Sequence, residues 1–307
     1  MAKIKDSELI VNQGKIYHLG LKPGELAKNI FVVGDPARVD KVAAHFDRIE
    51  HKASHLGYIS RTGTYKGMPV TVMSTGIGTD NTEIALVEFF GLNEFDLETR
   101  IRKDNAQPLT IIRIGTSGGL QREIEVGTLA ISSYAIGLDS TGLFYNQLAP
   151  DRFAKHLEDK AYSLINSITP EKSRFRGKIH PYASRASPEV VDALRRSAEG
   201  HFEIGITVTA PGFFAPQGRV IPGIELTAPG LQEKLAKFRM SGKRIINFEM
   251  ESSLLFHLAG MMGYRCGTVC PIIANRPAGT FLEDYSEAVD RAIMTGLKAM
   301  RGLYKEL

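Results

Sequence analysis

The chain has 307 residues, of which 43% are hydrophobic and 23% charged, so it can bury the core of one large domain or two small ones. Its 38 basic and 34 acidic residues give a formal net charge of +4 and form no block of five or six like charges. That distribution argues against a nucleic-acid-binding arm and against a basic membrane-binding helix.

No apolar run approaches the roughly 18 residues that span a bilayer, and residues 1–15 lack the apolar core of a signal peptide. We therefore expect a cytoplasmic protein. The two cysteines, Cys266 and Cys270, are spaced too widely for a CxxC pair, and no His/Cys cluster completes a zinc site. Reduced thiols in the core are expected, and no metal.

Along the chain, short apolar runs rich in Val, Ile and Thr and bounded by Gly or Pro predict β-strands. Several are apolar at consecutive positions, as in strands whose sheet is covered on both faces. These runs lie at 29–36, 68–78, 109–119, 126–136, 203–212 and 266–276.

Helical patterns alternate with these runs, at 81–95, 151–168, 188–200, 250–263 and 285–304. Gly263 provides a C-cap for one of them, and the last places Val289, Ile293, Leu297, Met300 and Tyr304 on one face. The alternation predicts an α/β fold with a central mixed or mainly parallel β-sheet flanked by helices. We expect a single domain over 1–307, with polar surface insertions near 97–108 and 169–188.

Three predicted strands end in glycine-rich turns. The first is Gly34, followed by Asp35 and Arg38; the others are residues 74–78 (STGIG) and 115–119 (GTSGG). In open α/β sheets, ligands bind beyond the carboxyl ends of the strands. Glycine lets backbone N–H groups approach an anion, and Ser or Thr adds hydroxyl donors. Each turn alone is a weak signal, since none has the Walker A or GxGxxG spacing.

Arg113 is unusual because it lies inside the apolar run 109–119. An unpaired charge in a core costs several kcal/mol, so this guanidinium needs a carboxylate or a bound anion. On spacing alone, a structural salt bridge and a ligand site are equally good explanations.

Two further stretches carry functional groups. Residues 247–253 (NFEMESS) place Glu249 and Glu251 either side of Met250 at a helix start, where carboxylates favour the helix N-terminus or could bind sugar hydroxyls. Residues 212–220 (GFFAPQGRV) offer an aromatic face, an amide and a guanidinium that could bind a base, although loops commonly carry such residues.

Taken in order, these stretches resemble the nucleoside phosphorylase-I family. The matching segments cover nearly the whole chain: YHLGL (17–21), VGDPARV (33–39), STGIG (74–78), IIRIGTSGG (111–119), FFAPQGR (213–219), FEMESS (248–253) and NR (275–276). RIGTSGG followed by EMES is specific for the family. The Phe-x-x-x-Gln-x-Arg spacing indicates its uracil-specific branch, since purine-specific relatives lack that Gln/Arg pair.

The resemblance implies reversible phosphorolysis of uridine, with 2′-deoxyuridine as a further candidate, to uracil and (deoxy)ribose 1-phosphate in pyrimidine salvage. It implies no cofactor, because inorganic phosphate is the co-substrate. By carry-over, phosphate would be bound by Gly34, Arg38, Arg113 and Thr116; ribose by Met250, Glu251 and Glu249; and uracil by Phe213, Gln217, Arg219, Ile273 and Ala274.

The resemblance also implies a homodimer, or a hexamer built as a trimer of dimers, with active sites at the dimer interface. His18 would reach the ribose 5′-hydroxyl of a neighbouring subunit. The sequence departs from the family at Leu56, where bacterial members have a phosphate-binding arginine donated by the partner; His55 and Arg61 are nearby basic residues. Gly57 replaces an acidic residue of a monovalent cation site, so no cation is expected.

Other functions remain open at this stage: a nucleosidase that uses water, a purine nucleoside phosphorylase, or a nucleoside-binding homologue without activity. Arg38 and Arg113 argue against the nucleosidase, whereas Leu56 argues for it. Gln217 and Arg219 argue against purine specificity. The pair Glu249/Glu251 is not interpreted as a glycosidase acid/base pair, because their side chains need not converge.

Overall fold

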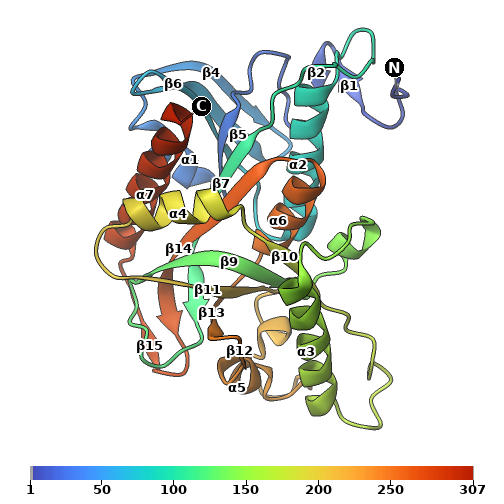
Figure 1. The fold of residues 1–307 in the computed structure, drawn as a ribbon, viewed down its shortest axis with the longest axis vertical. Coiled ribbons are helices and arrows are strands. Elements are labelled where there is room, and N and C mark those ends of the chain that lie inside the picture. Colours follow the sequence, from blue (N-terminus) through green and yellow to red (C-terminus); the bar gives the residue numbers. More distant parts are fainter. Residues whose placement is uncertain (1–2, 307) are drawn as a thin grey trace.

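A computed structural model of the chain describes residues 3–306, in which thirteen strands join one mixed sheet (Figure 1). The main path is β10 (Tyr182–Arg185), β9 (Leu129–Gly137), β11 (Phe202–Thr209), β13 (Lys243–Glu249), β8 (Ser117–Gly119), β14 (Arg265–Asn275), β7 (Thr110–Ile114), β3 (Asn29–Val33), β6 (Met68–Ser74), β5 (Tyr58–Tyr65) and β4 (Arg48–His55). Two short strands, β12 (Arg239–Met240) and β15 (Thr280–Phe281), pair with β13 and β14, and β1 (Val11–Asn12) with β2 (Lys15–Ile16) forms a separate hairpin.

The sheet contains two groups of parallel strands, which join each other through antiparallel pairs, and its margins are also antiparallel. β6, β3, β7, β14 and β8 run parallel to one another, as do β9, β11 and β13. β14 also pairs with β9, so the path β9–β11–β13–β8–β14 closes into a ring. This parallel arrangement brings the carboxyl ends of β3, β6 and β7 to one edge, which is where the predicted site residues begin.

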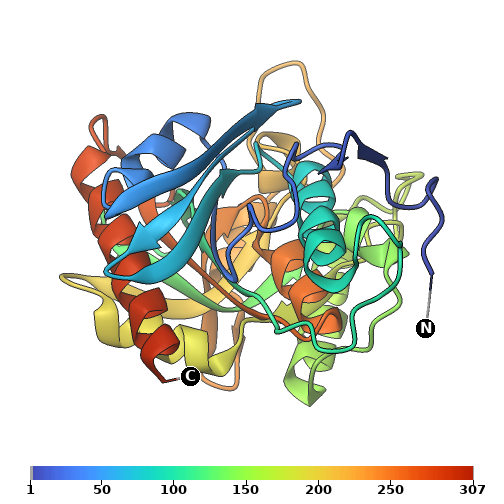
Figure 2. The ribbon, with the colours of Figure 1, turned by 90° about the horizontal axis from the view of Figure 1, so that it is seen from above.

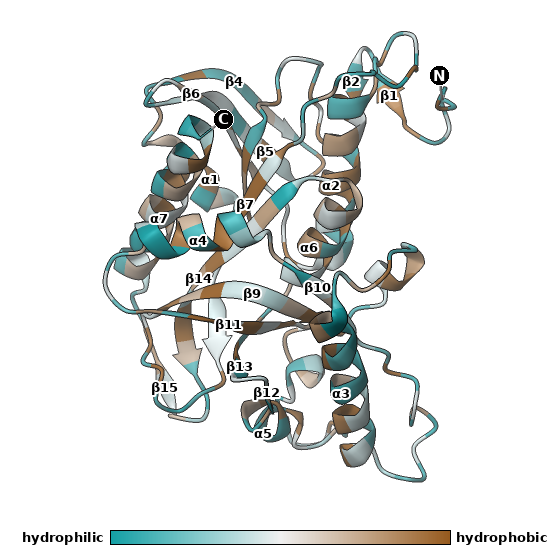
Figure 3. Ribbon diagram, viewed as in Figure 1, coloured by the Kyte–Doolittle hydropathy of each residue, from teal (hydrophilic) through white to brown (hydrophobic). Residues whose placement is uncertain are grey.

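Helices cover the sheet on both sides. They are α1 (Pro36–Ala43), α2 (Thr79–Glu94), α3 (Arg152–Ile168), α4 (Pro188–Ser197), α5 (Leu231–Ala236), α6 (Ser252–Met261) and α7 (Ser286–Lys305). From above, α7 lies on one side of the strands and α2 on the other (Figure 2). The amphipathic colouring of α3 and α7 in Figure 3 shows which helices keep one face in solvent.

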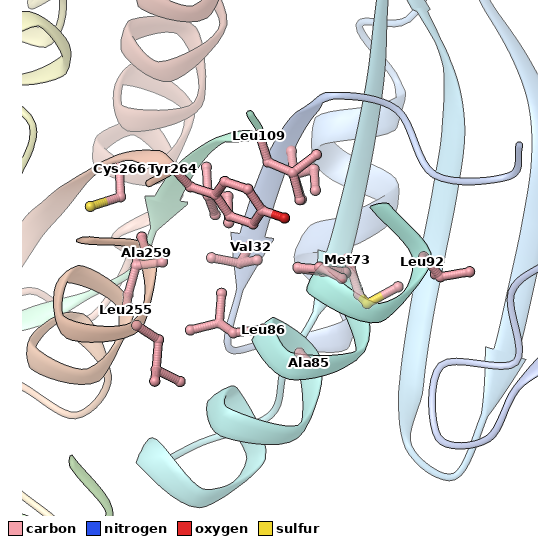
Figure 4. Packing of buried hydrophobic residues seen from close by; sticks show 14 of the residues in the cluster. Val32, Met73, Ala85, Leu86, Leu92, Leu109, Leu255, Ala259, Tyr264 and Cys266 are labelled. Carbon is pink, nitrogen blue, oxygen red and sulfur yellow. The ribbon is translucent and has the colours of Figure 1, made fainter. Parts of the chain in front are cut away.

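Three large hydrophobic clusters fill the space between sheet and helices, one on each face of β3 and a third under α3 and α5. Along β3, Ile30 and Val32 face the cluster under α2 and α6, while Phe31 and Val33 face the cluster under α1 and α7. Figure 4 shows residues of the first cluster, with side chains from strands and from both helices meeting around Leu86. Both faces of β3 are therefore buried, which explains its consecutive apolar residues.

The predicted fold class is confirmed, and each predicted strand and helix is present with boundaries shifted by a few residues. The run 109–119 is the exception, because Gly115 and Thr116 interrupt it and separate β7 from β8. α6 ends as predicted: Gly263 has φ = 71°, and the N–H groups of Gly263 and Tyr264 donate to the carbonyls of Gly260 and Ala259.

The prediction that 169–188 is a surface insertion was wrong for its last part. Residues 182–185 form β10, which pairs antiparallel with β9, and Tyr182 is buried. Proline and charged residues on both sides obscured this short strand. Residues 97–108 contain isolated bridge pairs but neither a helix nor a regular strand, as expected of a connection. Within residues 3–306, no helix combines the length and apolarity that crossing a membrane requires.

The packing of the first cluster predicts a large stability loss in Leu86→Ala. Leu86 is 1% exposed, so the truncation should reduce the free energy of unfolding by about 2–5 kcal/mol through lost burial and a cavity. Urea denaturation measures this change. Leu148→Ala is the matched control, because Leu148 is 88% exposed and its loss should cost less than about 0.5 kcal/mol. Equal effects of the two variants would contradict the packing described here.

Candidate active site

Twelve of the thirteen predicted site residues line one cavity of about 640 Å³. The cavity lies beyond the carboxyl ends of β3, β6, β7, β13 and β14, where ligands bind in open α/β sheets. The lining residues from the prediction are Gly34, Arg38, Arg113, Thr116, Phe213, Gln217, Arg219, Glu249, Met250, Glu251, Ile273 and Ala274. His18 lies outside this cavity.

Arg113 is buried in β7 and forms an ion cluster with two carboxylates. Its Nη2 pairs with Oε2 of Glu251, and its Nη1 lies 3.4 Å from Oε2 of Glu249. Nη1 also donates to the Sγ of Cys270 at 3.0 Å. Burial acts to lower the pKa of Arg113, but the two carboxylates outweigh it, so the pKa is raised and the residue stays charged. Arg113 thus has its structural salt bridge and also faces the cavity.

Gly115 is required by the position of the Arg113 side chain. A Cβ at residue 115 would overlap the guanidinium of Arg113, which folds back over its own strand end. The sequence suggested that this glycine lets a backbone N–H approach an anion. The structure gives a different reason, which is space for the cation.

The two glutamates have different surroundings, although both are buried. Glu249 Oε1 accepts a hydrogen bond from the Thr209 hydroxyl. Its Oε2 accepts from the N–H groups of Glu251 and Ser252 at 3.0 and 2.9 Å and from the Ser252 hydroxyl at 2.8 Å. Protein donors therefore occupy both oxygens of Glu249, which caps the start of α6.

Glu251 has fewer protein donors and more remaining capacity to accept hydrogen bonds. Its Oε1 accepts from the N–H of Gly78 at 2.8 Å, and its Oε2 pairs with Arg113. Burial raises the pKa of this carboxyl, while Arg113 opposes the rise. A carboxylate with two oxygens can take about four hydrogen bonds, so Glu251 can still bind hydroxyl groups of a ligand in the cavity.

Arg38 is a buried cation without a carboxylate partner in the described part of the chain. It is 6% exposed and lies in α1, where its Nη1 donates to the carbonyl of Ile114 at 3.0 Å. Burial lowers its pKa, and the nearby charge of Arg113 lowers it further. Because an unpaired buried charge is unfavourable, this end of the cavity is suited to an anion. Thr116, whose hydroxyl has no hydrogen-bond partner among residues 3–306, lines the same cavity.

The other end of the cavity combines an aromatic ring with amide and guanidinium groups. The guanidinium of Arg219 lies 4.1 Å from the centre of the Phe213 ring, and its Nε donates to the Phe213 carbonyl at 3.0 Å. Gln217 is buried in a short 3₁₀ turn, and Arg276 donates to its carbonyl. Burial, with a smaller contribution from the charge of Arg219, lowers the pKa of Arg276 to about 10. These groups suit a planar ring with polar edge atoms.

His18 is held by a carboxylate at a separate place on the surface. Its Nδ1 lies 2.7 Å from Oε1 of Glu88, and the carboxylate of Glu88 also accepts from the N–H groups of His18 and Leu19. Leu56 lies at the exposed turn between β4 and β5. Neither His18 nor Leu56 lines the cavity of its own chain.

Sequence reasoning missed several lining residues. Ile77, Phe281 and Tyr285 face the cavity, and Arg276 supports Gln217. A signal existed for Arg276 and Ile77, which belong to the matching segments 275–276 and 74–78. Phe281 in β15 and Tyr285 before α7 lie in stretches without a distinguishing pattern. Among residues 3–306, no group of three His, Cys, Asp or Glu side chains is arranged to hold a metal ion.

Comparisons with known proteins agree on one family. Residues 28–303 match the phosphorylase superfamily. The chain is 32% identical to the uridine phosphorylase of Thermococcus kodakarensis over 88% of this chain and 80% of that protein, and 28% identical to that of Escherichia coli over 87% and 88%. A solved Trypanosoma brucei nucleoside phosphorylase, reported to show uridine phosphorylase activity, superposes with a TM-score of 0.83 at 31% identity, covering 96% and 99% of the two chains.

The ion cluster predicts that Glu249→Ala destabilises the protein strongly. The change removes one partner of a buried charge and the cap of α6, so the free energy of unfolding should fall by about 3–5 kcal/mol. Urea denaturation followed by circular dichroism measures it. Glu171→Ala, on an exposed connection, is the control and should stay within about 0.5 kcal/mol of the parent. A loss below about 1 kcal/mol in Glu249→Ala would show that the cluster has no structural role.

Proposed function

The chain belongs to the phosphorylase superfamily, and we propose that it is an enzyme that cleaves uridine with phosphate, giving uracil and ribose 1-phosphate. It is thus a pentosyltransferase of the nucleoside phosphorylase type. The named activity of the T. kodakarensis and E. coli relatives and of the T. brucei structure supports this assignment. We further propose that 2′-deoxyuridine is a substrate and that the reaction serves pyrimidine salvage in the cytoplasm.

One observation carries the proposal: a single cavity contains groups suited to each part of the reaction. Its anion end has the unpaired Arg38, and its opposite end has Phe213 beside Gln217 and Arg219. Glu251, with free acceptor capacity, also lines the cavity. A phosphate, a ribose and a pyrimidine match these three chemistries in turn.

In the proposed reaction, phosphate lies with Gly34, Arg38, Arg113 and Thr116. Its oxygen forms a bond to the anomeric carbon of ribose while the bond from that carbon to N1 of uracil breaks, and the bonding electron pair stays with the base. Gln217 and Arg219 stabilise the departing uracil anion. A preorganised donor aimed at such developing charge contributes about 3–4 kcal/mol in enzymes. The reaction needs no covalent intermediate and no resident cofactor, since phosphate is a co-substrate.

Ribose would be held by Glu251 and Met250. The free acceptor sites of Glu251 suit the sugar hydroxyls, and Met250 offers an apolar surface to the sugar face. Glu249 stands beside them, but its oxygens are already occupied. We therefore assign it the positioning of Arg113 and of the start of α6. Ile273 and Ala274 line the wall at the uracil end.

We also infer that the active form is a homodimer, or a hexamer assembled from dimers, with His18 bound to the ribose 5′-hydroxyl of the neighbouring subunit. Two observations support this. His18 lies outside the cavity of its own chain, and Glu88 holds its Nδ1, which leaves Nε2 available to a ligand. On this proposal the chain forms one domain and is dependent on a second copy for a complete site.

Uracil release with and without phosphate tests the reaction. The purified chain should release uracil from uridine only when phosphate is present, with ribose 1-phosphate formed in equal amount. Equal release without phosphate would identify a nucleosidase. Release of base from inosine but not from uridine would identify a purine enzyme, and binding of uridine without release would identify a non-catalytic homologue.

Substituting Arg38 should weaken the binding of phosphate without affecting the binding of uridine. Arg38→Ala removes the unpaired cation, so the KM for phosphate should rise about 10- to 100-fold, as expected for a lost hydrogen bond to a charged group. The KM for uridine should change little. Arg122→Ala, at an exposed arginine, is the matched control. An unchanged KM for phosphate in Arg38→Ala would remove the anion site proposed here.

A further inference from the structure

The anion end of the cavity has little uncompensated positive charge. Arg113 is neutralised by Glu249 and Glu251, and the two carboxylates together balance the two guanidinium groups. Of these two guanidinium groups, Arg38 lacks an acidic partner within residues 3–306, and one of its N–H groups already donates to Ile114. Inorganic phosphate has four oxygens that can accept hydrogen bonds, so neutral donors must contribute to its binding.

Tyr285 is a free donor in the same cavity. It lines the wall together with Gly34, Arg38 and Thr116 and is 38% exposed. Its carbonyl accepts from the N–H of Val289, which fixes its backbone at the start of α7, while its hydroxyl has no hydrogen-bond partner in residues 3–306. A phenolic hydroxyl can donate a hydrogen bond to an anion.

The position of Tyr285 relative to α1 places it at the anion end. Val289, one turn after Tyr285 in α7, packs in the same hydrophobic cluster as Val39, the residue that follows Arg38 in α1. Asp35 and Pro36, at the start of α1, line the cavity together with Tyr285. The turn before α7 therefore lies against the helix that carries Arg38.

We propose that Tyr285 binds phosphate, its hydroxyl donating a hydrogen bond to the same anion that Arg38 holds, from the same chain. The inference rests on the proposed phosphorolysis and adds a residue that the motif comparison did not indicate. Removing this hydroxyl should weaken the binding of phosphate and leave the binding of the nucleoside unchanged.

Tyr285→Phe tests the proposal because it removes the hydroxyl and keeps the ring. The KM for phosphate should rise about tenfold, as for a lost hydrogen bond to a charged group, with the KM for uridine and the melting temperature unchanged. Tyr304→Phe is the matched control, since Tyr304 is 37% exposed near the other end of the same helix. Its kinetics should equal those of the parent.

Calorimetric titration with inorganic phosphate in the absence of nucleoside provides a second measurement. Tyr285→Phe should weaken this binding by a similar factor, which supports the proposal independently of turnover. An unchanged phosphate affinity and KM would overturn it, and so would a raised KM for uridine alone, which would assign Tyr285 to the nucleoside. If the parent binds phosphate but releases uracil equally well without it, the proposed reaction fails while the titration still decides on Tyr285.

Discussion

The buried ion cluster of Arg113, Glu249 and Glu251 is the interaction on which the site depends. Arg113 comes from β7, and the two carboxylates come from the junction of β13 and α6. Each carboxylate is held in turn, Glu249 by Thr209 of β11 and Glu251 by the N–H of Gly78 before α2. One cation therefore fixes the relative positions of three strands and two helices. Breaking a buried pair by removing one partner is strongly unfavourable, so this geometry is preserved with or without a ligand.

The cluster also separates the roles of two residues that look alike in sequence. Glu249 and Glu251 are two positions apart, and a sequence gives no basis for assigning one to structure and the other to ligand. Their hydrogen bonds differ and support the proposed assignment. Glu249 accepts four hydrogen bonds from the protein, whereas within the described residues Glu251 accepts only from Gly78 and Arg113. Convergence of both side chains on Arg113 is a long-range consequence of β13 and β7 belonging to one sheet.

Much of the fold was predictable because the central strands are covered on both faces and therefore apolar at consecutive positions. The site was predictable in outline because parallel strands deliver their carboxyl-terminal loops to one edge. The β4–β5 hairpin and β10 were not, since polar residues on exposed or edge strands resemble loops. The sequence also could not predict why residue 115 is a glycine or that Tyr285 lines the cavity. Both depend on tertiary packing: the Arg113 side chain lies over the end of its own strand, and α7 shares a hydrophobic cluster with α1.

The charges of the site bear on how the proposed reaction is accelerated. The cavity lining contributes three positive and three negative charges, so the side chains of the site are close to neutral in sum: Arg38, Arg113, Arg219, Asp35, Glu249 and Glu251. A phosphate dianion entering the site is stabilised by Arg38 and by neutral donors, but it adds net negative charge to a poorly solvated cavity. As the bond to uracil breaks, positive charge develops on the ribose next to that dianion. The negative charge that develops on the leaving base is instead stabilised by Arg219. In the proposed reaction, the interactions between these charges are thus more favourable in the transition state than in the ground state. This is the condition for raising kcat rather than only tightening substrate binding.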